Sequence, residues 1–235
     1  MKIHFISYGN EVYASSKRRI ENEAKQFNKF DNICIYSPEM LSDCFKNTFS
    51  DIFLYSRGGG YWIWKFDIIL QELDKMEEDD VLVYLDAGCS IVATGEKRFE
   101  EYIEMLKQSE HNSIGFELTQ KQKEYTTQEI YNALNIEVDD SCQLMGGCQI
   151  YKKNKKLIEM FHDILNVLRK DPYLISDKYN ECQKLYFIDN RHDQSILSLM
   201  RKKYGTLTLP YTEVEPGNVD PEIKKNFPFS ATRLR

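Results

Sequence analysis

An aspartate that follows a buried apolar run is the strongest candidate for chemistry in this sequence. The run Val81–Leu85 ends directly at Asp86, and two small residues, Ala87 and Gly88, come next. A continuous apolar run of this length predicts a buried strand of a parallel sheet. Open α/β sheets bind ligands beyond the carboxyl ends of their strands, so Asp86 would stand at the binding edge beside small residues that admit a bulky ligand. A carboxylate there suits a divalent cation or a ribose hydroxyl, whereas the alternative is that Asp86 only begins a turn or caps a helix.

A second candidate is Arg57–Lys65, in which three glycines precede both tryptophans of the chain and a lysine. The spacing of apolar residues beyond this segment predicts a helix that begins near Trp64 or Lys65. Because N–H groups and the helix dipole favour an anion at a first helical turn, Lys65, together with Arg57, is a candidate to bind a phosphate. The alternative is that Lys65 is a solvated surface residue and the tryptophans belong to the core. The spacing to the lysine and the missing Ser or Thr exclude a Walker loop.

Two further segments carry groups that could contact a sugar or a metal. Gly146 and Gly147 lie in the predicted strand Gln143–Tyr151, where a glycine pair indicates either a bulge or close approach of a ligand to the backbone. His192–Ser195 precedes a predicted helix, and Asp193 in it is a good N-cap. The imidazole, carboxylate and carboxamide of this segment are also the groups needed to bind a metal and several hydroxyls at once.

Alternating strands and helices must position these residues. The predicted strands are 3–7, 33–36, 81–85, 114–116 and 143–151. The predicted helices follow residue 10, begin near residue 64, cover 99–106 and 157–168, and run from 194 to Gly205, a natural helix-terminating residue. The strand, helix and strand at the start of the chain are typical of a βαβ unit with a parallel sheet. We therefore predict one α/β domain over residues 1–235, with a central, mostly parallel sheet flanked by helices.

The composition excludes several classes of protein. The net charge of −6 argues against a broad nucleic-acid-binding face, and the basic runs 152–156 and 201–203 are expected to be solvated helix faces. The six cysteines form no CxxC pair and no zinc spacing, so we expect free thiols in a reducing compartment. No apolar run approaches the roughly 20 residues that span a bilayer, and the N-terminus does not read as a signal peptide. A cytoplasmic, soluble protein is expected.

Taken in order, these segments resemble the GT-A nucleotide-sugar glycosyltransferases, and more narrowly a group found in bacteria and large DNA viruses. The segments that carry the resemblance are Gly60–Lys65 (GYWIWK), Leu85–Cys89 (LDAGC), Gly146–Gly147 and His192–Ser195 (HDQS). It extends from about residue 3 to residue 205. It implies a nucleotide-binding half over about residues 1–90, an acceptor half over about residues 91–210, and a C-terminal tail over residues 211–235, which is expected to be mostly loop.

The resemblance also implies a nucleoside-diphosphate sugar, such as a UDP-sugar, as donor, a glycan acceptor, and Mn²⁺ or Mg²⁺ as the usual metal. Asp86 takes the place of the first Asp of the family's DxD motif and would contact the ribose or, through the metal, the diphosphate. Gly88 occupies the second position, so the usual carboxylate pair is missing and His192 is the first candidate for another metal ligand. The other implied nucleotide contacts are Ser7, Tyr8, Arg57, Lys65, Ala87 and Gly88. The implied sugar and acceptor contacts are Trp64, Gly146, Gly147, His192, Asp193 and Gln194.

The implied reaction transfers a sugar to an acceptor hydroxyl, as in glycan biosynthesis. If the anomeric centre inverts, Asp193 would take the acceptor's proton; if the configuration is retained, Asp193 would orient the donor. Because the second carboxylate is missing, the rival hypothesis is a non-catalytic module that binds a glycan or a nucleotide. A nucleotidyltransferase is a weaker hypothesis, since Ser7–Asn10 is a poor match to its Gly-rich basic loop.

Overall fold

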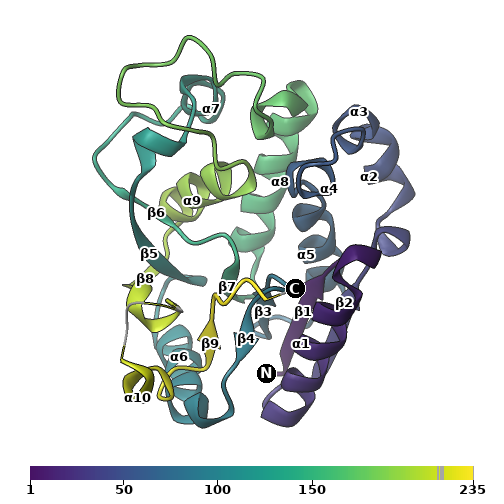
Figure 1. Ribbon diagram of the computed structural model, residues 1–235, viewed down its shortest axis with the longest axis vertical. Coiled ribbons are helices and arrows are strands. Elements are labelled where there is room, and N and C mark those ends of the chain that lie inside the picture. Colours follow the sequence, from purple (N-terminus) through teal and green to yellow (C-terminus); the bar gives the residue numbers. More distant parts are fainter. Residues whose placement is uncertain (216, 218–219, 235) are drawn as a thin grey trace.

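A seven-stranded sheet lies at the centre of the computed structural model, which describes residues 1–215, 217 and 220–234 (Figure 1). The strands lie in the order β2-β1-β3-β7-β5-β6, and β8 pairs with β5. They are β1 (Ile3–Tyr8), β2 (Asn32–Tyr36), β3 (Val81–Leu85), β5 (Ser113–Lys121), β6 (Cys142–Leu144), β7 (Cys148–Lys152) and β8 (Leu207–Pro210). Strands β1, β2, β3, β5 and β8 run in one direction, and β6 and β7 run against them. The predicted α/β class with a mostly parallel sheet is confirmed.

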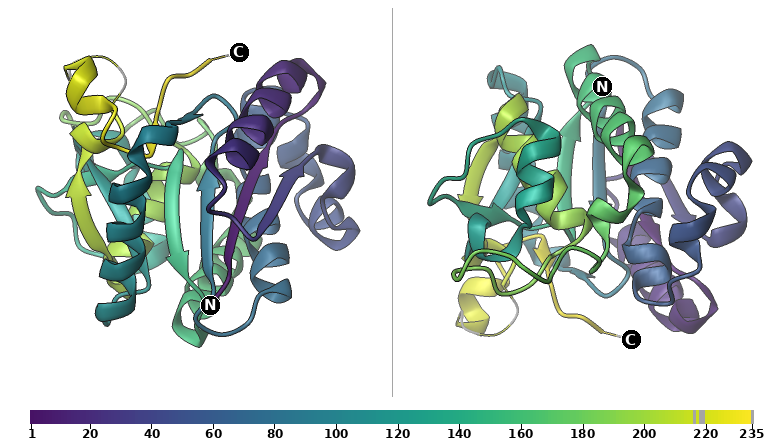
Figure 2. Two further views of the ribbon diagram at one scale, coloured as in Figure 1. Left: turned by 90° about the horizontal axis from the view of Figure 1, so that it is seen from below. Right: turned by 90° about the horizontal axis from the view of Figure 1, so that it is seen from above.

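Helices cover both faces of the sheet (Figure 2). They include α1 (Ala14–Phe27), α5 (Trp64–Lys75), α6 (Glu96–Gln108), α8 (Lys155–Lys170) and α9 (Asp193–Tyr204). One core lies between the sheet and α1 and α6, and the other lies between the sheet and α5, α8 and α9. Strand β3 is buried along its whole length because its alternate side chains enter the two cores, Leu82 and Tyr84 on one side and Val83 and Leu85 on the other.

The parallel arrangement of the first three strands brings their carboxyl ends together. Strand β1 pairs in parallel with β2 on one side and with β3 on the other, and α1 makes the crossover from β1 to β2. The predicted βαβ unit is therefore confirmed. In the pairing of β1 with β3, Ile6 lies opposite Tyr84. Two residues further along both strands, Tyr8 and Asp86 reach the same edge of the sheet.

The predicted strand over 143–151 is two strands. Strands β6 and β7 are separated by a turn that contains Gly146 and Gly147. The turn interrupts the sheet because its backbone groups bond elsewhere: the Gly146 N–H donates to Gln194 Oε1 at 2.9 Å, and the Gly147 carbonyl accepts from the Asp86 N–H at 2.9 Å. Strands β6 and β7 run in the same direction, both antiparallel to β5, so the sequence pattern did not reveal the break between them.

Other boundaries differ from the prediction by small amounts. His192, with φ 57°, is the N-cap of α9, and Asp193 is the first residue of that helix rather than its cap. Helix α9 ends before Gly205, whose φ of 91° confirms the predicted terminating role. The short elements that the apolar pattern did not indicate are α2 (Asp43–Thr48), α3 (Ser50–Phe53), α4 (Gly58–Tyr61), α7 (Gln128–Leu134), α10 (Pro221–Lys224), β4 (Ser90–Ile91), β8 (Leu207–Pro210) and β9 (Phe229–Ser230). In the described ranges, every cysteine is a free thiol, and no helix is long and apolar enough to cross a membrane.

Candidate active site

Asp86 directly follows β3. In the described part of the chain, one of its two carboxylate oxygens has bonding partners and the other has none. Tyr84 donates its hydroxyl to Asp86 Oδ1 at 2.5 Å, and Lys65 Nζ lies 3.5 Å from the same oxygen. For the second oxygen, Oδ2, the described residues provide no hydrogen bond, and the side chain is 41% exposed. The carboxylate is therefore fixed in orientation while one oxygen remains accessible to a ligand.

Lys65 is buried beneath this carboxylate. Its side chain is 2% exposed, and its ammonium pairs with Asp193 and donates to the Gly146 carbonyl at 3.0 Å. Burial alone would lower the pKa of Lys65, but the nearby carboxylates of Asp193 and Asp86 outweigh burial and raise the pKa above its usual value. Lys65 is consequently a charged group that links α5, α9 and the end of β3.

Asp193, on α9, is the ion-pair partner of Lys65. It lies in the first turn of that helix, where the dipole favours a negative charge. Burial raises the pKa of Asp193 to about 6, against the opposing effect of the Lys65 ammonium. The ion pair with Lys65 occupies Asp193 Oδ2. We name Lys65, Asp86, Asp193 and Tyr84 the lysine cluster.

The turn between β6 and β7 closes the other side of the lysine cluster. A Cβ on Gly147 would lie 2.7 Å from Asp86 Oδ2, and a Cβ on Gly146 would lie 3.0 Å from Gln194 Cβ. Glycine at position 147 is thus what leaves room for the Asp86 carboxylate. Gln194 holds the turn from α9, since its Oε1 accepts the Gly146 N–H.

The segment before α5 places an aromatic pair at the end of β1. Gly58, Gly59 and Gly60 all have positive φ, which allows the tight turn that precedes the helix. Trp64 then donates its indole N–H to the Gly58 carbonyl at 2.9 Å and stacks on Tyr8 with ring centroids 3.7 Å apart. The predicted nucleotide contact Tyr8 is therefore covered on one face by the tryptophan predicted to contact sugar.

Ser7, the residue before Tyr8, is fully buried, and its hydroxyl has no hydrogen-bond partner in the described part of the chain. An unpaired buried hydroxyl has a free-energy cost. Ser7 lies near the carboxyl end of β1, and its hydroxyl is enclosed by the protein.

His192 belongs to a second group of side chains beside the lysine cluster. Its Nε2 lies 2.9 Å from Asp177 Oδ1, and its ring stacks on Tyr61 with centroids 4.9 Å apart. Arg57 donates to the other oxygen of Asp177 at 2.8 Å. Burial lowers the pKa of His192, so the imidazole is neutral at pH 7. The Asp177 carboxylate therefore contacts both the imidazole of His192 and the guanidinium of Arg57.

Most of the predicted site residues lie together in the structure, but the two predicted phosphate-binding cations have unexpected partners. Asp86, Lys65, Asp193 and the Gly146–Gly147 turn form one cluster. Lys65 and Arg57, both predicted to contact phosphate, already pair with carboxylates. Over residues 1–215, 217 and 220–234, no group of three or more His, Cys, Asp or Glu side chains is placed to bind one metal ion.

Two partners in the site were not predicted from the sequence. Tyr84 precedes Asp86 by two residues, so the alternation of a strand places both side chains on one face, and this signal was present in the sequence. Asp177 lies in a loop 15 residues before His192, and no local pattern marks it as a partner.

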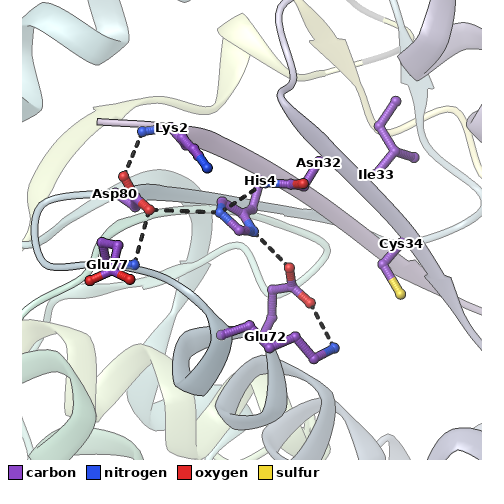
Figure 3. Close-up of a pocket in the computed structure, with 9 residues that line it drawn as sticks. Lys2, His4, Asn32, Ile33, Cys34, Glu72, Glu77 and Asp80 are labelled. Atoms are coloured by element: carbon purple, nitrogen blue, oxygen red, sulfur yellow. Dashed lines mark hydrogen bonds and ion pairs between the residues drawn. The ribbon is translucent and has the colours of Figure 1, made fainter.

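A hollow of about 420 Å³ lies at the opposite edge of the sheet (Figure 3). His4, near the start of β1, is directed between Glu72 and Asp80 there, with its Nδ1 2.7 Å from Glu72 Oε1 and its Nε2 3.8 Å from Asp80 Oδ2. We name His4, Glu72 and Asp80 the histidine cluster. It lies at the amino ends of the parallel strands, whereas the lysine cluster lies at their carboxyl ends.

Solved structures with the same overall arrangement include two glycosyltransferases. A glycosyltransferase involved in the glycosylation of the major capsid of PBCV-1 matches with a TM-score of 0.55 and 10% identity, over 98% of this chain and 92% of that chain. Mouse xyloside xylosyltransferase 1 matches with a TM-score of 0.50 and 11% identity, over 89% of this chain and 85% of that chain. This chain has a GT-A fold. No family model and no curated protein matches the sequence.

Proposed function

We propose that this protein is a glycosyltransferase that transfers a sugar from a nucleoside-diphosphate sugar to a hydroxyl of a glycan or glycoconjugate. The observation that carries the proposal is the placement of Asp86. In a fold shared with a glycosyltransferase along nearly its whole length, this carboxylate stands at the carboxyl edge of the parallel strands with one oxygen open. Ligands of open α/β sheets bind at that edge.

The donor nucleotide would lie between the ends of β1 and β3. Tyr8, held flat by Trp64, provides a surface for the base or ribose, and the unpaired Ser7 hydroxyl is a hydrogen-bonding group at the same end. Asp86 Oδ2 is suited to accept hydrogen bonds from ribose hydroxyls or to bind a cation. The neighbouring ends of two parallel strands thus supply both apolar and polar contacts for a nucleotide.

Lys65 acts in this proposal as a positioning residue. With Tyr84 it holds Asp86 Oδ1, which directs Oδ2 toward the ligand. Its ammonium is buried and paired with Asp193, so a phosphate would have to displace an existing ion pair to reach it. This geometry favours an indirect role in donor binding over the direct phosphate contact that the sequence suggested.

Asp193 fits an orienting role better than that of a general base. Its carboxylate is buried and bonded to the Lys65 ammonium, and a base must reach the proton of the acceptor hydroxyl. From the first turn of α9, Asp193 together with Gln194 instead fixes the Gly146–Gly147 turn and the Lys65 side chain against which the donor sugar would lie.

A divalent cation, Mn²⁺ or Mg²⁺, remains part of the proposal. The open Oδ2 of Asp86 fits one position of such an ion, while Nε2 of His192 is directed at Asp177. When bound, the cation would neutralise the negative charge that develops on the leaving diphosphate. Calorimetric titration of UDP and GDP with and without Mn²⁺ tests this point, and the expected result is tighter binding with the ion in the wild type but not in Asp86→Ala.

The decisive experiment compares the wild type with Asp86→Ala over a panel of UDP- and GDP-sugars. The wild type is expected to release nucleoside diphosphate from at least one donor, and the variant is expected to be slower by roughly 10²- to 10³-fold, the usual effect of removing one group that stabilises charge in a transition state. Circular dichroism should show an unchanged fold, because the Asp86 side chain is partly exposed. A variant that retains the wild-type rate would contradict the assignment.

The same panel separates catalysis from the rival binding function. A wild type that binds free glycans but neither binds nor cleaves any nucleotide sugar would identify a glycan-binding module instead.

A further inference from the structure

A buried glutamine lies in the middle of the sheet. Gln149 is the second residue of β7, and it pairs with Tyr84 of the neighbouring strand β3 (Figure 1). Because paired residues of adjacent strands share a face of the sheet, Gln149 lies on the face that packs against α5, α8 and α9. Its side chain is fully buried. A buried amide costs free energy unless its polar groups are bonded, so its hydrogen bonds indicate its role.

The orientation of the Gln149 amide is fixed from both ends. Tyr151, two residues later on β7, donates its hydroxyl to Gln149 Oε1 at 2.7 Å. Burial raises the pKa of Tyr151 to about 12, so the hydroxyl keeps its proton near neutral pH. At the other end, Gln149 Nε2 donates to the Gly146 carbonyl at 2.5 Å. A carbonyl can only accept a hydrogen bond, so the amide nitrogen must face it.

The Gly146 carbonyl is where this glutamine meets the lysine cluster. Lys65 Nζ donates to the same oxygen at 3.0 Å. A carbonyl oxygen has two lone pairs, and these two donors use both of them. The ammonium has three N–H groups, and the remaining two face the carboxylates of Asp193 and Asp86. The direction of the ammonium toward Asp86 therefore depends on where the Gly146 carbonyl is held.

We propose that Gln149 is a positioning residue, which fixes the Lys65 ammonium through the Gly146 carbonyl and thereby holds Asp86 in place for donor binding. The inference rests on the proposed function and assigns Gln149 no contact with the donor or the acceptor. Without the Gln149 N–H, the carbonyl is free to turn and the ammonium moves toward Asp193, its closer partner. Asp86 then keeps only the bond from the Tyr84 hydroxyl.

The first test measures kcat/KM of donor cleavage in Gln149→Leu, with the donor that the wild type accepts. The substitution removes both hydrogen bonds of the amide, and kcat/KM should fall about tenfold at pH 7. The matched control is Gln122→Leu, because Gln122 is also fully buried but donates to Thr126 Oγ1 and the Ser195 carbonyl. The control should lose stability and keep the kcat/KM of the wild type.

Gln149→Glu gives a reading that a purely structural role would not change. A protonated carboxyl group can donate to the Gly146 carbonyl and accept the Tyr151 hydroxyl as the amide does, whereas an ionised one has no proton to donate. The ratio of the kcat/KM of this variant to that of the wild type should therefore fall with rising pH. Titration of the introduced carboxyl group by ¹³C NMR gives the expected pH range. A ratio that does not follow this titration would overturn the inference.

A double-mutant cycle of Gln149→Leu and Lys65→Met tests the link without any donor. Urea denaturation gives the unfolding equilibrium constants of the wild type, both single variants and the double variant. If Gln149 acts on Lys65, the constant of the double variant should differ about tenfold from the value expected for independent effects. The control cycle pairs Gln149→Leu with Lys75→Met, whose ammonium contacts Glu72 of the histidine cluster, and should be additive.

Tyr151→Phe is the milder variant for both measurements. It removes only the hydroxyl that orients the amide, so it should lower kcat/KM in the same direction by a smaller factor. It replaces Gln149→Leu if that variant does not fold.

The outcomes separate this inference from the proposed function. If Asp86→Ala loses donor cleavage while Gln149→Leu keeps the wild-type kcat/KM and the cycle with Lys65→Met is additive, only the role of Gln149 is wrong. If the wild type cleaves no donor but the cycle shows coupling, the proposed function is wrong and the positioning of Lys65 by Gln149 is supported.

Discussion

The lysine cluster and the histidine cluster lie at opposite ends of the same parallel strands and have a similar composition. Each places one basic side chain between two carboxylates, Lys65 between Asp193 and Asp86, and His4 between Glu72 and Asp80. Both carboxylates of the histidine cluster are buried, whereas Asp86 of the lysine cluster is partly exposed. They differ in how completely their oxygens are bonded. Within the part of the chain that the structure describes, one oxygen of Asp86 accepts no hydrogen bond.

The carboxylates of the histidine cluster accept hydrogen bonds from other parts of the chain. Asp80 accepts the backbone N–H groups of Lys2 and Glu77, at 2.5 and 3.0 Å, and Glu72 accepts the Tyr36 hydroxyl at 2.9 Å. These bonds fasten the start of β1 to α5 and to the turn before β3. The carboxylates of the histidine cluster are thus bonded through both oxygens to the backbone and to neighbouring side chains, whereas Asp86 keeps one oxygen without a hydrogen bond from the described residues.

The largest effect is expected from Lys65→Met. Removing the ammonium leaves Asp193 buried without its partner, which typically costs about 3–5 kcal/mol of the free energy of unfolding. Urea denaturation at pH 7 measures the loss. The matched control is Lys75→Met, whose ammonium lies 3.3 Å from Glu72 but is 54% exposed, so its removal should change stability by less than about 1 kcal/mol. Equal effects of the two substitutions would contradict the distinction.

Gly147→Ala should affect the lysine cluster without removing a charge. The new Cβ would lie 2.7 Å from Asp86 Oδ2 and would push the carboxylate from its position. A displacement of about 1 Å at a reacting centre lowers turnover by roughly 100-fold, and kcat for donor cleavage measures it. Gly217→Ala, at an exposed position, is the control. A variant with unchanged kcat would show that the position of Asp86 does not limit the reaction.

Glu72→Gln addresses the histidine cluster in the same way. Glutamine retains the shape of the side chain but weakens the bonds to His4 and Tyr36, so the free energy of unfolding should fall by about 1–2 kcal/mol. The kcat of the folded variant should equal that of the wild type, with Glu77→Gln on the exposed rim as control. A selective loss of kcat would indicate that this end of the sheet also serves the reaction.

The smallest effects are expected in the pH dependence of stability, where the clusters should differ in sign. Burial raises the pKa of Asp193 to about 6, so the stability of the wild type relative to Asp193→Asn should fall as the pH rises from about 4 to about 6. Burial would also raise the pKa of Glu72, but hydrogen bonds from His4 and Tyr36 lower it, so the advantage over Glu72→Gln should be lost as the pH falls below about 4.5. Parallel pH profiles of the two differences in unfolding free energy would contradict this contrast.

The sequence predicted most strands of the sheet and the place of Asp86, but neither β8 nor the division between β6 and β7. Apolar runs identify buried strands directly, so the strand over 81–85 and the βαβ unit were predicted with nearly their observed bounds. The short helices α2, α3 and α4 were missed because segments of four to six residues show too few repeats of an apolar pattern.

The partners within the site depend on contacts between distant segments. The spacing around Lys65 indicates a helix start, but not that its ammonium is turned inward to Asp193, 128 residues later. The bond between His192 and Asp177 and the bonds of Thr232 and Leu234 to the Gly88 carbonyl are similarly set by how loops meet in space. Residue types therefore indicated the candidate site, and tertiary packing determined which of its charged groups are already paired.

The two tryptophans of the chain give the site an optical property. Trp64 stacks on Tyr8 at the carboxyl edge of the sheet, and Trp62 packs 5.4 Å from the ring of His192. Because the sequence contains no other indole, all of the tryptophan emission of this protein arises beside the lysine cluster. Its intrinsic fluorescence is therefore a label-free reporter of this region, in which a change in the environment of either ring can be followed directly by titration.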